Sequence, residues 1–201
     1  MSSTGRKEDR VEGDVYPTPR WCVRRLLEAC SDLPTGLWAE PCVGEGAIVQ
    51  AVREARGDVC RWVTQDLRIV PAPHNSVAHY GGDFLGAPGD MFRDEDVRVL
   101  LTNPPFSLAR SFIERSEELM PRAWRIFLLR LNFLGSDDRH AWLSRNMPIS
   151  IYQLPNRPSF VRGKTDSIEY GWFVWPPDNE PRWNAQISLL GLTSLEERKR
   201  G

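Results

Sequence analysis

Residues 36–55 read GLWAEPCVGEGAIVQAVREA. The short apolar run at 36–39 is typical of a buried strand, and a turn that contains Gly44 and Gly46 follows it. Residues 47–55 then repeat apolar side chains at helical spacing, and Gly57 supplies a stop. The stretch therefore predicts a strand, a glycine loop and a helix in succession.

The same alternation continues on both sides of this stretch. Helices are predicted at 21–29, beginning near Thr18-Pro19, and at 109–119; strands are predicted at 59–66, 76–80, 97–101 and 124–131. Strands that alternate with helices imply an α/β fold with a mostly parallel sheet and helices on both faces. The later strand-like pieces lie at 149–154, 167–175 and 185–190, and no convincing helix separates the last two, which predicts at least one antiparallel edge pair.

Length and composition fit one domain. The chain has 201 residues, of which 41% are hydrophobic and 26% charged. Polar composition predicts a flexible lead at 1–14 and a flexible tail at 193–201, which leaves 15–192 as a single domain. The longest apolar runs have only a few residues, against about 20 for a membrane span, and the polar N-terminus lacks a signal-peptide centre. We therefore expect a cytoplasmic protein with no membrane partner.

The four cysteines do not suggest a metal site. Cys22, Cys30, Cys42 and Cys60 lie 8, 12 and 18 residues apart, without a CxxC pair. Four reduced thiols and no bound metal are the expectation.

Charge is uneven along the chain although the net charge is only −1. Residues 121–170 carry eight basic and four acidic side chains, whereas residues 76–100 carry five acids and two arginines. A basic region could face a polyanion, but an uneven solvated surface explains the same pattern.

Polar residues follow four of the predicted strands. They are Glu40 to Gly46, then Asp66, then Asp83-Phe84, then Asn103-Pro104-Pro105-Phe106. Ligands of open parallel sheets bind beyond the carboxyl ends of the strands, so these groups are expected to converge on one crevice. The alternative for Asp66 and Asp83 is a turn in which each carboxylate bonds its own backbone. A nicotinamide site is disfavoured because Val49 stands where the third glycine of that fingerprint belongs.

Two of these motifs resemble those of a known family. The pattern Glu-Pro-x-x-Gly-x-Gly at 40–46, with Asn-Pro-Pro-Phe at 103–106, is similar to the class I S-adenosylmethionine-dependent methyltransferases, in particular the DNA adenine N6-methyltransferases of phages and bacteria. The resemblance covers about residues 15–175 and includes Tyr16-Pro17-Thr18-Pro19. It implies a Rossmann-like fold with a seven-stranded sheet, S-adenosyl-L-methionine as cofactor, DNA as partner, and methyl transfer to N6 of a flipped adenine.

The resemblance also assigns roles to residues. Around the cofactor it places Tyr16, Pro17, Thr18, Pro19, Glu40, Pro41, Gly44, Gly46, Asp66, Asp83, Phe84 and Asn103. Within this set Glu40 and Gly44 would border the methionine moiety, Asp66 the ribose, and Asp83 with Phe84 the adenine. In the catalytic motif, Asn103 and the carbonyl of Pro104 would accept hydrogen bonds from the target amine, with Pro105 fixing the backbone.

Substrate contacts are expected from Phe106 and from a later segment. Phe106 would stack on the extruded base, and Phe160 would offer a second aromatic surface. The segment 131–166 is the candidate recognition loop, in which Arg157 and Arg162 would hold phosphates or a guanine edge, surface salt bridges being the alternative.

Other functions stay open at this level. The motif begins with Asn, a variation shared with methyltransferases that act on RNA or on a protein glutamine. A catalytically silent relative that binds nucleic acid is the alternative from another class, although it would have no need of an intact Asn103-Pro104-Pro105-Phe106.

Overall fold

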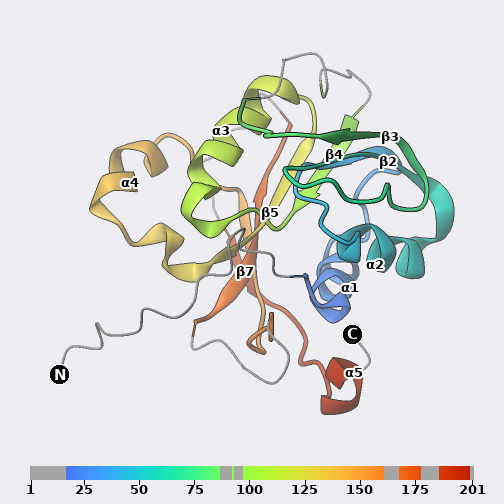
Figure 1. Cartoon of the computed structure of the whole chain (residues 1–201). Coiled ribbons are helices and arrows are strands. Elements are labelled where there is room, and N and C mark those ends of the chain that lie inside the picture. The colour runs from blue at the N-terminus through green and yellow to red at the C-terminus, as the bar shows by residue number, and fades with distance from the viewer. Residues whose placement is uncertain (1–16, 87–91, 93–96, 161–167, 178–185, 200–201) are drawn as a thin grey trace.

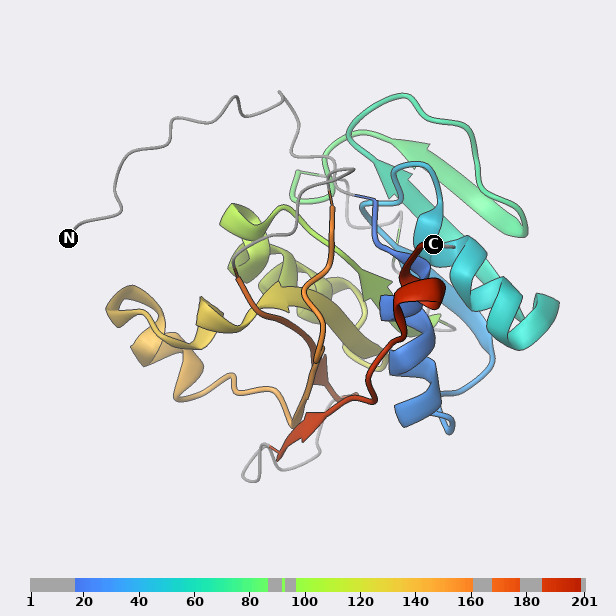
Figure 2. The same ribbon diagram turned by 90° about the horizontal axis from the view of Figure 1, so that it is seen from below.

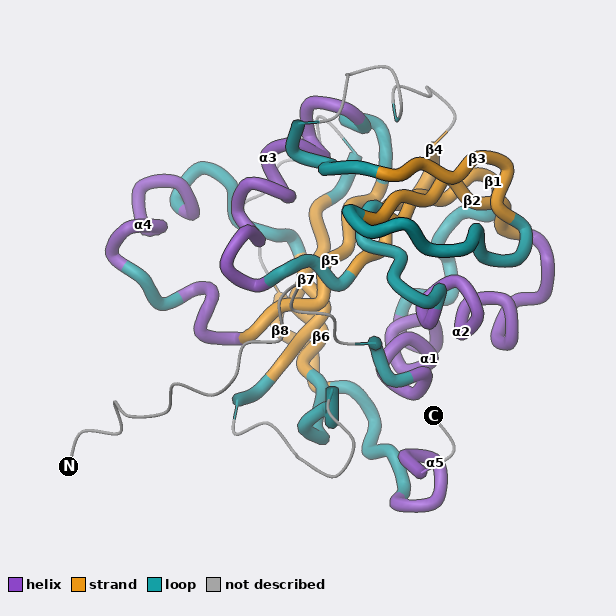
Figure 3. The backbone as a smooth tube through the Cα atoms, in the orientation of Figure 1, coloured by secondary structure: helices purple, strands orange, loops and turns teal. Residues whose placement is uncertain are grey.

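The computed structural model describes residues 17–86, 92, 97–160, 168–177 and 186–199. Its described residues form one sheet of eight strands (Figure 3). In spatial order these are β3 (Ser76–Gly81), β2 (Cys60–Asp66), β1 (Gly36–Glu40), β4 (Val97–Thr102), β5 (Trp124–Arg130), β7 (Tyr170–Trp175), β6 (Ser150–Gln153) and β8 (Gln186–Leu189).

The sheet is mostly parallel, as predicted. Strands β3, β2, β1, β4 and β5 pair in parallel, which places their carboxyl ends on one edge. The antiparallel pairing expected late in the chain is present, but it joins β7 to β5 and β6, and not to the last strand-like piece. Strand β8 pairs in parallel with β6 and adds one strand to the seven that the resemblance implies. It matches the strand-like piece at 185–190.

Helices cover both faces of the sheet (Figure 1). On one face α1 (Arg20–Ala29) and α2 (Ala47–Arg56) bury their apolar sides against a core that contains Trp38 and Trp62, whose rings meet edge to face at 5.5 Å. On the other face α3 (Ala109–Leu119) packs against a second core with Phe84 and Phe127. The alternation read from the sequence thus yields the expected layers.

The segment 131–166 is more than a loop where it is described. After the short 3-10 turn η3 (Leu131–Leu134) it forms α4 (Asp137–Leu143), and β6 follows (Figure 2). Helix α4 has only seven residues and buries Trp142 and Leu143, too few positions for helical periodicity to stand out in the sequence. Two further 3-10 turns, η1 (Gly57–Val59) and η2 (Phe106–Leu108), join neighbouring elements.

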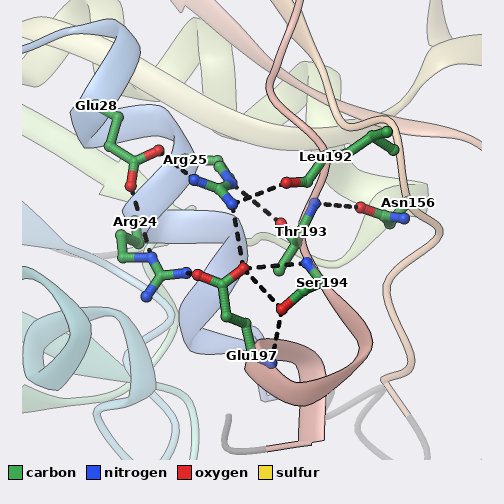
Figure 4. A network of polar contacts seen from close by, with 8 residues as sticks. All are labelled: Arg24, Arg25, Glu28, Asn156, Leu192, Thr193, Ser194 and Glu197. Carbon is green, nitrogen blue, oxygen red and sulfur yellow. Dashed lines mark hydrogen bonds and ion pairs between the residues drawn. The ribbon is translucent and has the colours of Figure 1, made fainter.

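The end of the chain docks on α1 (Figure 4). Composition predicts a flexible tail from residue 193, but the structure has a short helix there, α5 (Leu195–Lys199), preceded by Thr193 at 3% exposure. The Arg25 guanidinium donates from Nε to Thr193 Oγ1 at 3.1 Å, and Glu197 pairs with Arg24. The Thr193 amide donates to Asn156 Oδ1 at 2.9 Å. Because these contacts are polar, the low hydrophobicity of the segment gave no sign of them.

All four cysteines are free thiols. Within the described ranges, no cluster of three or more His, Cys, Asp and Glu side chains is arranged to hold a metal ion. None of the helices described has the length and apolar character needed to cross a membrane.

Candidate functional site

The loop after β1 depends on its glycines. Gly44 and Gly46 have φ values of +52° and +78°, a backbone region that side chains rarely adopt. Gly46 immediately precedes α2, and a Cβ there would lie 3.2 Å from Pro73 of the segment between β2 and β3. The loop therefore combines left-handed backbone with a close approach to its neighbour, which fits the glycines that the sequence singled out.

Glu40 ends β1 and is buried, at 2% exposure. Burial raises the pKa of its carboxyl well above the ordinary value, the charge of Asp66 adds to the rise, and a hydrogen bond from the Val49 backbone opposes it. The Oε2 atom has no hydrogen-bond partner among the described residues. A cationic group beside this oxygen would favour the ionised carboxylate, and S-adenosylmethionine carries both an ammonium and a sulfonium. The residues present fit that cofactor.

Cys42 lies in the glycine loop and is influenced by three acids. Burial raises the pKa of the Cys42 thiol, and the negative charges of Glu40, Asp66 and Asp83 raise it further. The Asp66 carboxylate accepts from the Gly44 amide at 2.8 Å, so the ends of β2 and β1 meet here, as expected of parallel strands. Sequence reasoning treated Cys42 only as a small buried side chain.

Asp66 makes the backbone contacts that its turn interpretation predicts. Its Oδ1 accepts from the Arg68 amide at 2.9 Å and from Arg68 Nε at 3.1 Å, while its Oδ2 accepts from the Gly44 amide at 2.8 Å. The same carboxylate thus fastens the glycine loop to the end of β2. A role towards ribose hydroxyls stays a prediction, and Arg68 shares the oxygen that such a ligand would use.

Asp83 and Phe84 lie after β3. The exposed Asp83 accepts from the Leu85 amide at 3.0 Å, again a turn within its own segment. Phe84 is 2% exposed and stacks on Phe112 with ring centroids 5.1 Å apart. Phe84 is thus a core residue in this structure, and the contacts of both residues with an adenine ring stay predictions.

Asn103 follows β4 directly and meets the segment before α1. Its Nδ2 donates to Thr18 Oγ1 at 3.1 Å, although the two residues are 85 positions apart. Helix α1 begins at Arg20, directly after Thr18-Pro19 as predicted, while Thr18 is 5% exposed and makes no side-chain cap on it. Pro17 and Pro19 flank Thr18, Pro41 is buried in the glycine loop, and Tyr16 lies outside the described residues.

The rest of the motif leads into an aromatic cluster. Pro104 is buried, Pro105 precedes η2, and Phe106 begins it. The Phe106 ring lies 6.2 Å from that of Phe160 and 5.4 Å from that of Tyr170, centroid to centroid. Phe160 and Tyr170 meet at 5.0 Å. The predicted proximity of the two phenylalanines is therefore present, and Tyr170 is an addition.

Arg130 completes this group, which we call the Phe106 cluster: Phe106, Phe160, Tyr170 and Arg130. Its guanidinium carbon lies over the Phe106 ring, 4.8 Å from the centroid, and its Nε donates to the Tyr170 hydroxyl at 3.2 Å. Sequence reasoning missed Arg130. Its position at the last residue of β5, on the edge where the motifs gather, was the available signal.

Arg157 has a protein partner. Its Nη2 lies 2.6 Å from Glu169 Oε1, and both side chains are 48% exposed. The salt bridge that was the alternative for Arg157 is thus present, and a contact with phosphate stays a prediction. Arg162 lies outside the described residues.

Comparison with known proteins yields structural similarity only. No family model matches the chain, and no curated protein matches its sequence. Among solved structures, it is similar to a protein of Vibrio vulnificus assigned as the modification subunit of a type I restriction enzyme, with TM-score 0.63 and 16% identity over 93% of this chain and 49% of that one. A Listeria monocytogenes protein assigned as a class I S-adenosylmethionine-dependent methyltransferase matches with TM-score 0.58 and 14% identity, over 90% and 66% of the two chains. A Pyrococcus horikoshii protein assigned as an RNA methyltransferase matches with TM-score 0.56 and 14% identity, over 86% and 90%.

The chain has the Rossmann-like fold of class I methyltransferases. It spans about half the length of the Vibrio protein and two thirds of the Listeria protein. At these identities the similarity establishes the fold, and the activity has to be argued from the site.

Proposed function

We propose that the protein transfers the methyl group of S-adenosylmethionine to the exocyclic N6 amine of adenine in DNA. The observation that carries the proposal is the position of Asn103: it stands at the carboxyl end of a central strand, oriented by Thr18, beside a glycine loop with a buried unmatched carboxylate. A fold shared with proteins assigned as methyltransferases, among them a restriction-enzyme modification subunit, supports it.

The cofactor supplies an electrophilic methyl group on a sulfonium. Glu40 is suited to the positive charge of the cofactor. Its Oε2 has no partner among the described residues, and in a buried site little water screens the attraction between a carboxylate and a cation. Asp66 and the backbone of Gly44 lie at the ends of two neighbouring strands and are joined to each other at 2.8 Å. These residues bind and orient, and none of them takes part in bond making.

For the adenine amine that receives the methyl group, the protein needs to supply only hydrogen-bond acceptors. An adenine amine is a weak nucleophile because its lone pair is shared with the ring. Asn103 Oδ1 and the Pro104 carbonyl would accept from its two hydrogens and favour the tetrahedral form. The N–C bond then forms as the S–C bond breaks, and the amine loses one proton to solvent. Positioning and electrostatic stabilisation supply the catalysis.

The target base has to leave the helix stack before it can reach Asn103. Extrusion costs a few kcal/mol and is offset by stacking on apolar or aromatic surfaces. Phe106 and Phe160 offer such a surface directly beside the motif.

The test is a methylation assay with three substrates. The purified chain is incubated with labelled S-adenosylmethionine and, separately, unmethylated plasmid DNA, total RNA and a peptide library containing glutamine. Digestion and mass spectrometry should reveal N6-methyladenine in DNA. Label in RNA or in peptide alone would replace the substrate class, and cofactor binding without transfer to any substrate would favour the silent relative.

Asn103→Ala supplies the control for the active site. It should lower turnover on the order of a hundredfold or more, a far larger effect than any on the cofactor dissociation constant. Gln50→Ala, on the exposed side of α2, is the matched surface variant and should keep full activity. Full turnover by Asn103→Ala would show that Asn103 does not accept a hydrogen bond from the target amine during methyl transfer.

A further inference from the structure

Phe106 needs a fixed ring plane if a base is to stack on it beside Asn103. It begins the short turn η2, is only partly buried, and is therefore not held by the core alone. The rings of Phe160 and Tyr170 meet it edge-on or tilted, at interplanar angles of 62° and 49°. Neither ring lies parallel to it, so neither stacks on it face to face.

Arg130 is the group that lies over a face of Phe106. The 4.8 Å from its guanidinium carbon to the ring centroid is within the range of cation–π contacts. A guanidinium is planar, stays charged at any accessible pH, and stacks well on aromatic rings. Lysine would provide the charge without the plane.

The orientation of Arg130 is in turn fixed by Tyr170. Its Nε donates to the hydroxyl of Tyr170, a residue with 0% exposure on the neighbouring strand β7. Arg130 and Tyr170 are also partners in the antiparallel register of β5 and β7, so the contact is set by the sheet. The contacts therefore run from Tyr170 in the sheet to Arg130, and from Arg130 to Phe106 at the start of η2.

We propose that Arg130 is a positioning residue for methyl transfer: it covers one face of Phe106 and fixes the ring so that the target base stacks on the opposite face. This inference rests on the proposed function, because it assumes a base as the stacking partner. It assigns Arg130 and Tyr170 to the acceptor side of the site, where neither the motifs nor the family resemblance had placed them.

Steady-state kinetics on unmethylated plasmid DNA test the proposal. Arg130→Met keeps the length of the side chain and removes charge and plane, so kcat/KM for DNA should fall about tenfold. KM for S-adenosylmethionine should stay within about twofold. Arg130→Lys should recover part of the loss, and Tyr170→Phe, which removes only the hydroxyl, should lose several-fold.

A spectroscopic measurement follows the ring itself. With 4-fluorophenylalanine at position 106, the fluorine resonance should broaden or shift in Arg130→Met and less so in Arg130→Lys. Thermal unfolding of each variant checks that the fold is kept, and the Tyr170→Phe variant stands in if Arg130→Met fails to fold.

The outcomes separate the two proposals. If the wild-type chain transfers no methyl group to DNA, the proposed function fails and this inference fails with it. If the wild-type chain is active and Arg130→Met is equally active, the inference alone is overturned. Higher DNA affinity in Arg130→Met would also overturn it, since Arg130 would then occupy the place of the base.

Discussion

Asn103 and Thr18 are joined by a hydrogen bond of 3.1 Å from the amide nitrogen to the threonine hydroxyl. With Nδ2 turned towards Thr18, the orientation of the amide is fixed, and Oδ1 is the atom of that amide that acts as an acceptor. The segment before α1 therefore determines which way the key side chain of β4 points. Thr18 thus precedes α1 at the predicted helix start and also contacts the Asn-Pro-Pro-Phe motif.

Replacing Thr18 should lower the rate of methyl transfer. Thr18→Val has nearly the same volume but cannot accept from Asn103, so the amide loses its orientation and kcat should fall roughly tenfold. Thr18→Ser keeps the hydroxyl and should stay within about threefold of wild type. Steady-state kinetics measures both. A Thr18→Val enzyme with unchanged kcat would remove Thr18 from the orientation of Asn103.

The fold was predictable because its signals are local and repeated. The run from Gly36 to Glu40, the glycine loop and the helix after it each carry their own pattern, and the strands at 97–102 and 124–130 are strongly apolar. What escaped prediction were short or polar pieces. Helix α4 has seven residues, and α5 is held by ion pairs to α1, which no periodicity reveals.

Only the part of the candidate site that lies at the ends of strands could be predicted from the sequence. Glu40, Asp66 and Asn103 could be placed on one edge because parallel strands end together. Contacts between distant segments could not be read in the same way. The stacking of Arg130 on Phe106 depends on side-chain directions at β5 and η2, and the burial of Phe84 on a partner, Phe112, from α3.

Glu40→Gln should make the cofactor-free protein more stable at neutral pH. Burial raises the pKa of Glu40, so from about pH 4.3 upward the unfolded carboxyl releases its proton while the folded one keeps it. The folded state then binds more protons, and the free energy of unfolding falls as pH rises until the folded pKa is passed. The Glu40→Gln variant does not lose free energy of unfolding in this way, because glutamine does not titrate. Urea unfolding between pH 4 and pH 8 should show a stability difference that grows with pH, and a constant difference would contradict it.

The same substitution should weaken cofactor binding. A cation beside Glu40 favours the ionised carboxylate, so affinity for S-adenosylmethionine should rise with pH and binding should release a proton. Calorimetry in two buffers of different ionisation enthalpy measures that proton. In Glu40→Gln both the release and the pH dependence should vanish, and the affinity should fall about tenfold or more. Unaltered affinity would take Glu40 out of the cofactor site.

Arg68→Gln should tighten cofactor binding. Arg68 Nε occupies Asp66 Oδ1 at 3.1 Å, and this half-exposed ion pair has to open if the ribose hydroxyls are to reach that oxygen. The gain should be a few-fold, the size expected of an exposed pair. Arg61→Gln, at an exposed arginine on β2, the strand that ends at Asp66, is the matched control and should change nothing. Weaker binding in Arg68→Gln would mean that Arg68 contacts the cofactor.

Substitutions of Arg157 and Glu169 should have opposite effects on DNA binding. The hydrogen bond from Arg157 lowers the pKa of Glu169, so the pair is ionised at neutral pH and the carboxylate competes with phosphate for the guanidinium. Arg157→Ala should weaken binding to a fluorescent duplex and reduce the slope of log affinity against log salt by about one. Glu169→Gln releases the arginine and should tighten binding by up to about fivefold at low salt. Arg61→Ala again controls for the loss of one positive charge. A salt slope unchanged in Arg157→Ala would leave Arg157 as a surface ion pair and remove it from the DNA-contacting residues.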